Sequence, residues 1–309
     1  MLTLFISFQI ITFALQGFKM KKALLFILFA GLLTLGVVLI VNSCAIKKEE
    51  TSKQPIETTK TPAISADEDI NNEQDFTYLY TSRSSIHAPF GYPQDSDTLD
   101  DYIIEKPQYI LSYCGEKNLP NWVAWELNAD WVGDTPRKTG RFLIEPNLPD
   151  GYYRVTHDDY THSGYDRGHL VRSKERTKTV EDNVSTFEMG NIVPQTPDLN
   201  RGVWLRFEDY CLTKAINEKK NMYIVAGGIF HDTITLKGEG KVAIPDSCFK
   251  IVVFSEETDL NMIDFEELES VSVAMPNTAG IRGDAWEKYE TTIDRIERST
   301  GYRFFGKVR

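Results

Sequence analysis

The stretch that decides the fold of this chain reads YDRGHL over residues 165–170, with NIVPQ following at 191–195 and NRGVW at 200–204. These motifs bring together one histidine, two arginines, an aspartate and two asparagines. The third motif runs into a segment whose apolar residues recur at spacings of three and four, which predicts a helix from Asp198 to about Glu218. Aspartate is favoured at the cap before a helix, so Asp198 is the expected cap.

The residue types in and around these motifs indicate phosphodiester chemistry. His169 is a candidate general base, because an imidazole can take a proton near neutral pH. Arg167 and Arg141 can each present a planar fork to phosphate oxygens. Asn200, in the first turn of the predicted helix, can point an oxygen at a hard cation, and one neutral protein ligand fits Mg²⁺. Glu208 lies about two turns further along and suits a role through a metal-bound water better than direct ligation.

A structural role is the alternative for each of these residues. Asn200 is also a good helix-capping residue, and Glu208 alone would be read as part of a solvated helix face. Arg167 can form an ion pair with its neighbour Asp166, and Arg141 can be an exposed strand residue. We favour the functional reading for Asn200 because His169 accompanies it.

A second polar cluster, His157-Asp158-Asp159 with His162, has side chains that can bind zinc or iron. The whole segment 147–165 reads as loop, so substrate contact or plain loop is expected there instead. His87 and His231 are expected to be structural or exposed.

The motifs resemble those of the DNA/RNA non-specific endonuclease family, of the ββα-metal type that includes endonuclease G. The resemblance rests on DRGH at 166–169, NIVPQ at 191–195, and Asn200-Arg201-Gly202 with Trp204 and Glu208. It extends over roughly residues 109–305. It implies an α+β fold with a mixed, mainly antiparallel sheet and flanking helices. It also implies an endonuclease that depends on Mg²⁺ (or Mn²⁺), hydrolyses DNA and RNA, and binds both through the phosphate backbone without sequence preference.

The same resemblance assigns roles to individual residues. His169 would activate water, Asn200 would be the direct Mg²⁺ ligand, and Glu208 would hold a metal-bound water. Arg141 and Arg167 would bind the scissile phosphate or stabilise the transition state. The supporting residues would be Asp166 and Asn191, ordering the metal waters and the His169 loop.

One position departs from the family pattern. Leu212 stands where some members carry an arginine, one helical turn after the glutamate. The absence of this arginine removes a phosphate contact but leaves the base and the metal ligand in place. Two alternatives stay open: a phosphodiesterase acting on smaller nucleotide substrates, which the acidic composition favours, and a non-catalytic surface lipoprotein that binds a partner on the same fold, which Leu212 favours.

Short apolar runs predict the remaining elements. Strands are expected at Tyr109–Tyr113, Trp122–Leu127 and Met222–Ala226, and as a pair at Lys241–Pro245 and Phe249–Phe254. A second helix is expected at Ala285–Ser299, with Gly301 as its C-terminal cap, and the acidic residues 94–106 read as loop. Strands and helices are interspersed without regular alternation, which favours an α+β fold over a doubly wound sheet.

Residues 1–43 are expected to lie outside the fold, as a signal sequence or membrane anchor. Translation is expected to start at Met20, before an uncharged run at 23–41. Cys44 follows a small residue after this run, as in a lipoprotein signal where the cysteine is lipid-modified. The length of the run also fits a single-pass anchor, so both alternatives stay open. Either one places the remainder outside the cytoplasm, in the periplasm or at the cell surface.

Composition separates a tether from one domain. Residues 44–75 hold almost no large apolar side chains and are expected to be a disordered tether, whereas 76–309 read as a single endonuclease domain. The formal net charge of −11 argues against a long basic groove, but it leaves room for a small cationic site. Cys114, Cys211 and Cys248 form no CxxC pair, so one disulfide plus a thiol and three buried thiols remain equally open.

Overall fold

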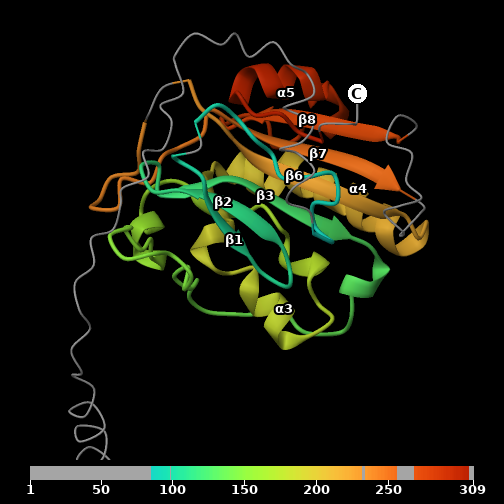
Figure 1. Ribbon diagram of the computed structural model, residues 1–309, viewed down its shortest axis with the longest axis horizontal. Helices are drawn as coiled ribbons and strands as arrows, with labels where there is room; N and C mark the ends of the chain where they lie inside the picture. The colour runs from blue at the N-terminus through green and yellow to red at the C-terminus, as the bar shows by residue number, and fades with distance from the viewer. Residues whose placement is uncertain (1–84, 98, 232–233, 256–267, 306–309) are drawn as a thin grey trace, which may run out of the picture. The chain divides into compact units, whose positions relative to one another are not determined.

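Seven strands form one sheet in the order β1-β2-β3-β6-β7-β8-β9, and every neighbouring pair is antiparallel. Figure 1 shows them side by side in this computed structural model. Their bounds are β1 Tyr102–Glu105, β2 Ile110–Cys114, β3 Leu119–Leu127, β6 Asn221–Ile229, β7 Ser247–Ser255, β8 Ser270–Pro276 and β9 Glu290–Thr291. The strands expected around Tyr109, Trp122, Met222 and Phe249 are thereby confirmed.

The structure describes residues 85–97, 99–231, 234–255 and 268–305. The signal or anchor expected at 1–43 and the tether expected at 44–75 lie outside these residues. Within the described residues, no helix combines the length and apolar character needed to cross a membrane.

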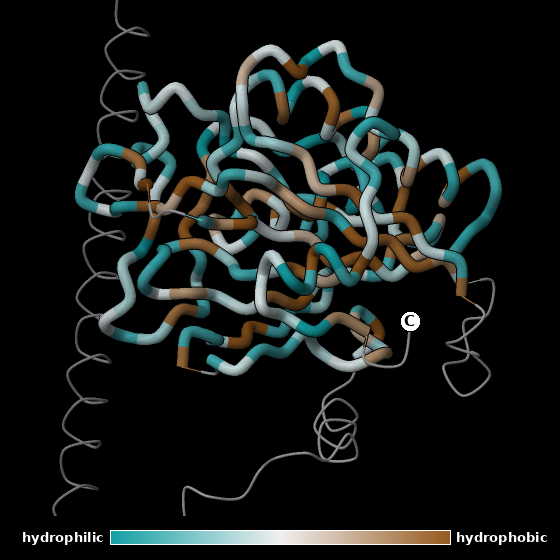
Figure 2. Tube along the Cα trace, turned by 90° about the horizontal axis from the view of Figure 1, so that it is seen from above, coloured by the Kyte–Doolittle hydropathy of each residue, from teal (hydrophilic) through white to brown (hydrophobic). Residues whose placement is uncertain are grey.

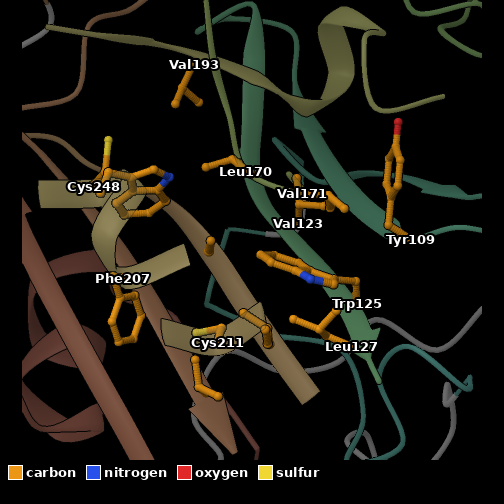
Figure 3. Packing of buried hydrophobic residues seen from close by; sticks show 14 of the residues in the cluster. Tyr109, Val123, Trp125, Leu127, Leu170, Val171, Val193, Phe207, Cys211 and Cys248 are labelled. Carbon is orange, nitrogen blue, oxygen red and sulfur yellow. The ribbon is translucent and has the colours of Figure 1, made fainter. Parts of the chain in front are cut away.

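Both faces of the sheet are buried, because side chains alternate between two apolar clusters. On β3, Val123, Trp125 and Leu127 join one cluster, while Trp122 and Ala124 join the other. Helix α4, Trp204–Asn217, covers the first face through Phe207 and Cys211, which Figure 3 shows close to Trp125 and Leu127. Helix α5, Ile293–Thr300, packs on the second face through Ile296. Figure 2 shows the apolar stretches concentrated inside the trace and the hydrophilic stretches in peripheral loops.

A second, two-stranded sheet carries the first two motifs. Strand β4, Asp166–His169, pairs antiparallel with β5, Ile192–Gln195. Leu170, Val171 and Val193 anchor this small sheet to the α4 side of the core (Figure 3). The intervening chain holds α3, Val180–Ser185. Short 3₁₀ turns occur at Ala129–Trp131, His157–Tyr160, Ser173–Glu175, Met189–Asn191 and Trp286–Tyr289. This architecture is the expected α+β fold.

The helix predicted from Asp198 begins differently. Its first turn, Leu199–Val203, is a π-helical turn, and regular α-helix follows in α4. Asp198 does not cap the helix, because its Oδ2 accepts the backbone N–H of Gly280 at 2.7 Å. Gly202 kinks the backbone with φ −120° and ψ −110°, and a Cβ there would lie 2.8 Å from the Cα of Arg282. The close approach of that distant segment therefore sets the helix start.

Three other expectations about secondary structure are wrong. Residues 94–106 are not all loop, because Tyr102–Glu105 adds β1 to the sheet edge. Residues 241–245 form only an isolated bridge between Ala243 and Thr235, and β7 pairs instead with β6 and β8. The C-terminal helix begins at Ile293, where Thr292 caps it, since Glu290 and Thr291 pair with β8. Gly301 ends that helix with φ 81°, as expected.

Of the two alternatives for the cysteines, the structure shows three buried thiols and no disulfide among the described residues. Cys114, Cys211 and Cys248 are all buried free thiols. They behave as small apolar side chains, with Cys211 and Cys248 in the cluster under α4.

Candidate active site

His169 ends strand β4 in a largely apolar pocket. Its ring lies 5.3 Å from that of Phe142 and 5.0 Å from that of Phe187, centroid to centroid, and the residue is 9% exposed. Burial, together with the charges of Arg137 and Arg172, lowers the pKa of His169 to about 3. The imidazole is therefore neutral at neutral pH. Its Nε2 is buried without a hydrogen-bond partner in the described residues, so it is free for a water or a substrate group.

Glycine in the DRGH motif is explained by the second motif. Gly168 pairs with Val193 in the small sheet, and a Cβ at position 168 would run into the side chain of Gln195. Gln195 is fully buried and ends the NIVPQ motif. The two motifs thus interlock, and this contact sets the path of the strand that ends in His169.

Asn191 holds the chain just beyond His169. Its Nδ2 donates to the carbonyls of Val171 and Thr186 at 2.9 Å each, and its Oδ1 accepts the N–H of Val171 at 2.8 Å. All polar atoms of its fully buried amide are therefore used within the protein. This geometry fits the expected ordering of the His169 loop and leaves no side-chain atom for metal waters.

Asp166 connects the same strand to the third motif. Its Oδ2 accepts Nδ2 of Asn200 at 2.9 Å, and its carboxylate forms a two-point ion pair with Arg201 at 2.5 and 2.7 Å. Burial alone would raise the pKa of Asp166, but the hydrogen bonds from Arg201 and Asn200 outweigh it and hold the pKa below its usual range. Nδ2 of Asn200 donates to Asp166. The Oδ1 of Asn200 therefore remains as the acceptor that can face a cation.

Arg167 lies on the His169 side of the strand. Its guanidinium carbon is 5.9 Å from the centre of the Phe142 ring, and the group donates to the His157 carbonyl and, at 2.9 Å, to Thr161 Oγ1. Arg141 lies further out, with 63% of its side chain exposed, and pairs with Asp158 at 2.5 Å. The structure thus brings Arg167 beside the His169 pocket and leaves Arg141 on the loop that borders it.

The second polar cluster is largely structural. Asp159 Oδ2 accepts the N–H and hydroxyl of Thr156 at the start of the 3₁₀ turn, and Oδ1 accepts the hydroxyl of Tyr153. His157 Nδ1 accepts the N–H of Phe142 at 3.2 Å. These contacts hold the loop whose His157 carbonyl and Thr161 hydroxyl accept hydrogen bonds from Arg167. His87 is structural as expected, with ring nitrogens bonded to Pro107 and Glu126.

Glu208 lies on the inner face of α4 among cations and aromatic rings. Its Oε1 is 3.7 Å from Nζ of Lys250, and its Oε2 is 3.6 Å from Nε of Arg172. Lys250 is itself buried, with Nζ 4.5 Å from the centre of the Trp204 ring. Burial raises the pKa of Glu208 to about 7, against the opposing effect of Lys250 and Arg172. Its carboxyl is therefore poised to lose a proton when a cation approaches.

Sequence reasoning missed four residues of this site. Arg137 and Arg172 are the two cations that act on His169, and Lys250 is the cation buried against Glu208. Asn277 clamps the chain before Asn200: its Oδ1 accepts the N–H of Thr196 at 2.7 Å and its Nδ2 donates to two carbonyls. A cationic residue three positions after His169 was a usable signal for Arg172, but Asn277 lies 81 residues from its partner and gave none.

The donor set fits a hard divalent cation. Asn200 offers a neutral oxygen as a direct ligand, and Glu208 offers an Oε1, buried without a hydrogen bond in the described residues, that can accept from a metal-bound water. Asp166 acts on the cation indirectly, because it orients Asn200. The described residues also contain one group of three acidic side chains with ligand atoms within 4.8 Å, namely Asp95, Asp100 and Asp101. That group precedes β1 and shares no residue with the candidate site.

Known proteins are similar to this chain in sequence and in fold. The model of the DNA/RNA non-specific endonuclease family matches residues 86–309. A nuclease of Nostoc sp. is 40% identical over 229 residues, covering 72% of this chain and 82% of that protein. Human mitochondrial endonuclease G is 27% identical over 216 residues, covering 66% of this chain and 69% of that protein.

A solved structure matches as well. One chain in the crystal structure of the EndoG/EndoGI complex, a study of EndoG inhibition, covers 78% of this chain and 95% of itself with a TM-score of 0.61. Its sequence identity is 22%, so this similarity shows the fold. With nucleases as relatives and the family matched from residue 86 to residue 309, the protein belongs to the DNA/RNA non-specific endonuclease family of hydrolases.

Proposed function

We propose that this protein is an Mg²⁺-dependent endonuclease that hydrolyses DNA and RNA without sequence preference. One observation carries the proposal: strand β4 presents a neutral His169 with a partner-free nitrogen, and its first residue, Asp166, orients the amide of Asn200. A base on this strand and a neutral cation ligand bonded to its first residue are the minimum that phosphodiester hydrolysis requires. Mn²⁺ is the expected substitute for Mg²⁺.

His169 acts as the general base in the proposed reaction. The imidazole takes a proton from water as the water oxygen bonds to phosphorus. The bond from phosphorus to one sugar oxygen breaks, and that oxygen leaves with the electron pair and takes a proton from solvent. A phosphate between His169 and the pair Arg137 and Arg172 offsets the positive charge of these arginines. This raises the basicity of the His169 ring when substrate is bound.

The other residues bind and orient the substrate. Asn200 would hold the cation directly and Glu208 would hold it through a bound water, and the cation when bound supplies positive charge to the phosphoryl oxygens. Arg167 and Arg141 would contact phosphate oxygens as the diester approaches. Recognition through phosphates alone carries no base information, so cleavage is expected to be independent of sequence.

We further propose that the enzyme acts outside the cytoplasm, held by its N-terminal segment. The uncharged run at 23–41 and Cys44 support this location. Labelling of expressing cells with a radioactive fatty acid, beside Cys44→Ala, tests the lipid anchor. Label that requires Cys44 supports a lipoprotein, whereas membrane association without label supports a single-pass anchor.

The direct test uses the full-length protein on supercoiled plasmid and on total RNA, with Mg²⁺ and with chelator, beside His169→Ala. We expect metal-dependent degradation of both substrates, and a loss of about 1000-fold or more in the variant. Cleavage of a small chromogenic diester without cleavage of either polymer would instead favour a phosphodiesterase. Absence of cleavage with every divalent ion would favour a binding protein.

A further inference from the structure

Arg172 occupies a position between the proposed base and the acidic side of α4. It follows His169 by three residues, and its charge is one of the two that lower the pKa of that histidine. Its Nε lies 3.6 Å from Oε2 of Glu208, and its Nη1 donates to Oδ1 of Asp209 at 2.6 Å. Only 12% of the side chain is exposed. The guanidinium thus lies against Glu208 and Asp209, near enough to His169 for its charge to act on that ring.

The contacts of Arg172 leave part of its fork free. In the described residues, Nη2 of Arg172 has no acceptor, since the recorded contacts use Nε and Nη1. Asp209 is 55% exposed, so this ion pair is screened by water and weak. Oε2 of Glu208 lies 3.6 Å from Nε of Arg172, beyond hydrogen-bond distance, so Glu208 does not hold the guanidinium tightly. A cation held in this way can still take a phosphate oxygen.

The uncharged Leu212, close to Glu208 on α4, bears on the role of Arg172. Leu212 follows Glu208 by four residues in α4, so both side chains lie on the same side of the helix, one turn apart. An arginine there would border Glu208 from the next turn. In this chain Leu212 is uncharged, and the arginine beside Glu208 comes instead from the segment after β4, in addition to Lys250 from β7.

We propose that Arg172 binds a phosphate oxygen of the substrate and supplies the positive charge that Leu212 cannot. The proposal rests on the proposed function, because it assigns a substrate contact within the same site. Asp209 and Glu208 position the guanidinium, and Nη2 is the atom that meets the phosphate. Arg172 thereby provides the positive charge that an arginine at position 212 of α4 would provide.

The test exchanges the charge between the two positions. In the full-length protein, Arg172→Met is expected to lower kcat/KM on DNA about 100-fold, as for loss of a charge-assisted hydrogen bond in the transition state. Leu212→Arg alone is expected to change it less than about threefold. Leu212→Arg added to Arg172→Met is expected to recover at least about tenfold. The control is Arg303→Met, which removes an arginine paired with Glu297 on the opposite face.

A second readout does not depend on turnover. Binding of a short fluorescent DNA duplex in chelator is measured against salt for wild type and Arg172→Met, with thermal unfolding to confirm that both are folded. Loss of one phosphate contact should reduce the slope of log K against log salt by about 0.9. A reduced slope supports the proposal even if the wild type cleaves nothing, an outcome that would overturn only the proposed function. An unchanged slope in a folded variant would falsify the phosphate contact, and a fall in activity would then reflect Glu208 alone.

Discussion

The two ends of strand β4 differ more than any other neighbouring parts of the site. At its C-terminal end, His169 lies between aromatic rings, uncharged and 9% exposed. At its N-terminal end, Asp166 is ionised and paired with Arg201, whose side chain is 60% exposed. Only two residues of extended chain therefore separate an apolar pocket from a solvated, charged surface.

This difference matches two opposite chemical needs. A general base must be unprotonated before it can accept a proton, and burial beside two arginines ensures this at His169. A cation ligand must instead be reachable from water, and the proposed ligand Asn200 is oriented by a hydrogen bond to the charged Asp166. Because side chains alternate along a strand, one short strand can serve both environments.

Removing the cation ligand is expected to have the largest effect on this comparison. Asn200→Ala should lower kcat/KM on DNA about 1000-fold, because the charge of a bound cation is worth several kcal/mol to the transition state. His169→Ala should match this loss while leaving Mg²⁺ affinity, measured by calorimetry, unchanged. Equal Mg²⁺ affinity in Asn200→Ala and wild type would show that Asn200 is only a structural residue of the helix start.

The apolar end can be tested through the pH dependence of stability. The pKa of His169 is lowered to about 3 in the fold, below its ordinary value of 6.5, so the unfolded chain binds the extra proton. The associated stability is present above pH 6.5 and is lost as the pH falls towards the folded pKa. At pH 5 the loss should be about 2 kcal/mol relative to pH 7.

Comparison with a variant isolates this contribution. Urea unfolding in chelator should show that His169→Asn lacks the loss of about 2 kcal/mol between pH 7 and pH 5. Glu208, whose pKa is raised to about 7, acts in the opposite direction: its contribution weakens as the pH rises from 4.5 to 7. That effect is common to both proteins and cancels in the difference. The same pH dependence in both proteins would mean that the His169 ring is solvated.

A smaller effect should separate the two outer arginines. Arg137 acts electrostatically on His169 and lies with its guanidinium carbon 4.8 Å from the centre of the Phe187 ring, whereas Arg141 pairs with Asp158 in solvent. Arg137→Met should therefore lower kcat/KM about tenfold, and Arg141→Met less than about threefold. The reverse order would restore Arg141 to the role that the family resemblance assigns to it.

Contiguous patterns made much of this fold and site predictable. The apolar spacing after residue 198 predicted α4, and the strands around Trp122 and Phe249 followed from their apolar runs. Asp166 and Asn200 could be predicted as site residues because both lie within the motifs DRGH and NRGVW. Their hydrogen bond, across 34 residues of sequence, shows that the motifs meet in space.

Features set by distant backbone were not predictable in this way. Asp198 looked like a helix cap, but its carboxylate is used by the N–H of Gly280. The predicted helix from Ala285 is split because Glu290 and Thr291 complete the sheet edge. In each case a contact with another part of the chain overrides a local preference, and a single sequence carries no sign of it.

The smallest effect concerns how the loop holds Arg167. Thr161 Oγ1 accepts Nη2 of Arg167 at 2.9 Å, while the carbonyl of His157 accepts from the same guanidinium. Thr161→Val keeps the shape and the carbonyl bond but removes one acceptor, so kcat/KM should fall about threefold with no change in Tm. Thr213→Val, on α4 away from Arg167, is the matched control. A fall as large as that of Arg167→Met would show that the hydroxyl, and not the carbonyl, orients the arginine.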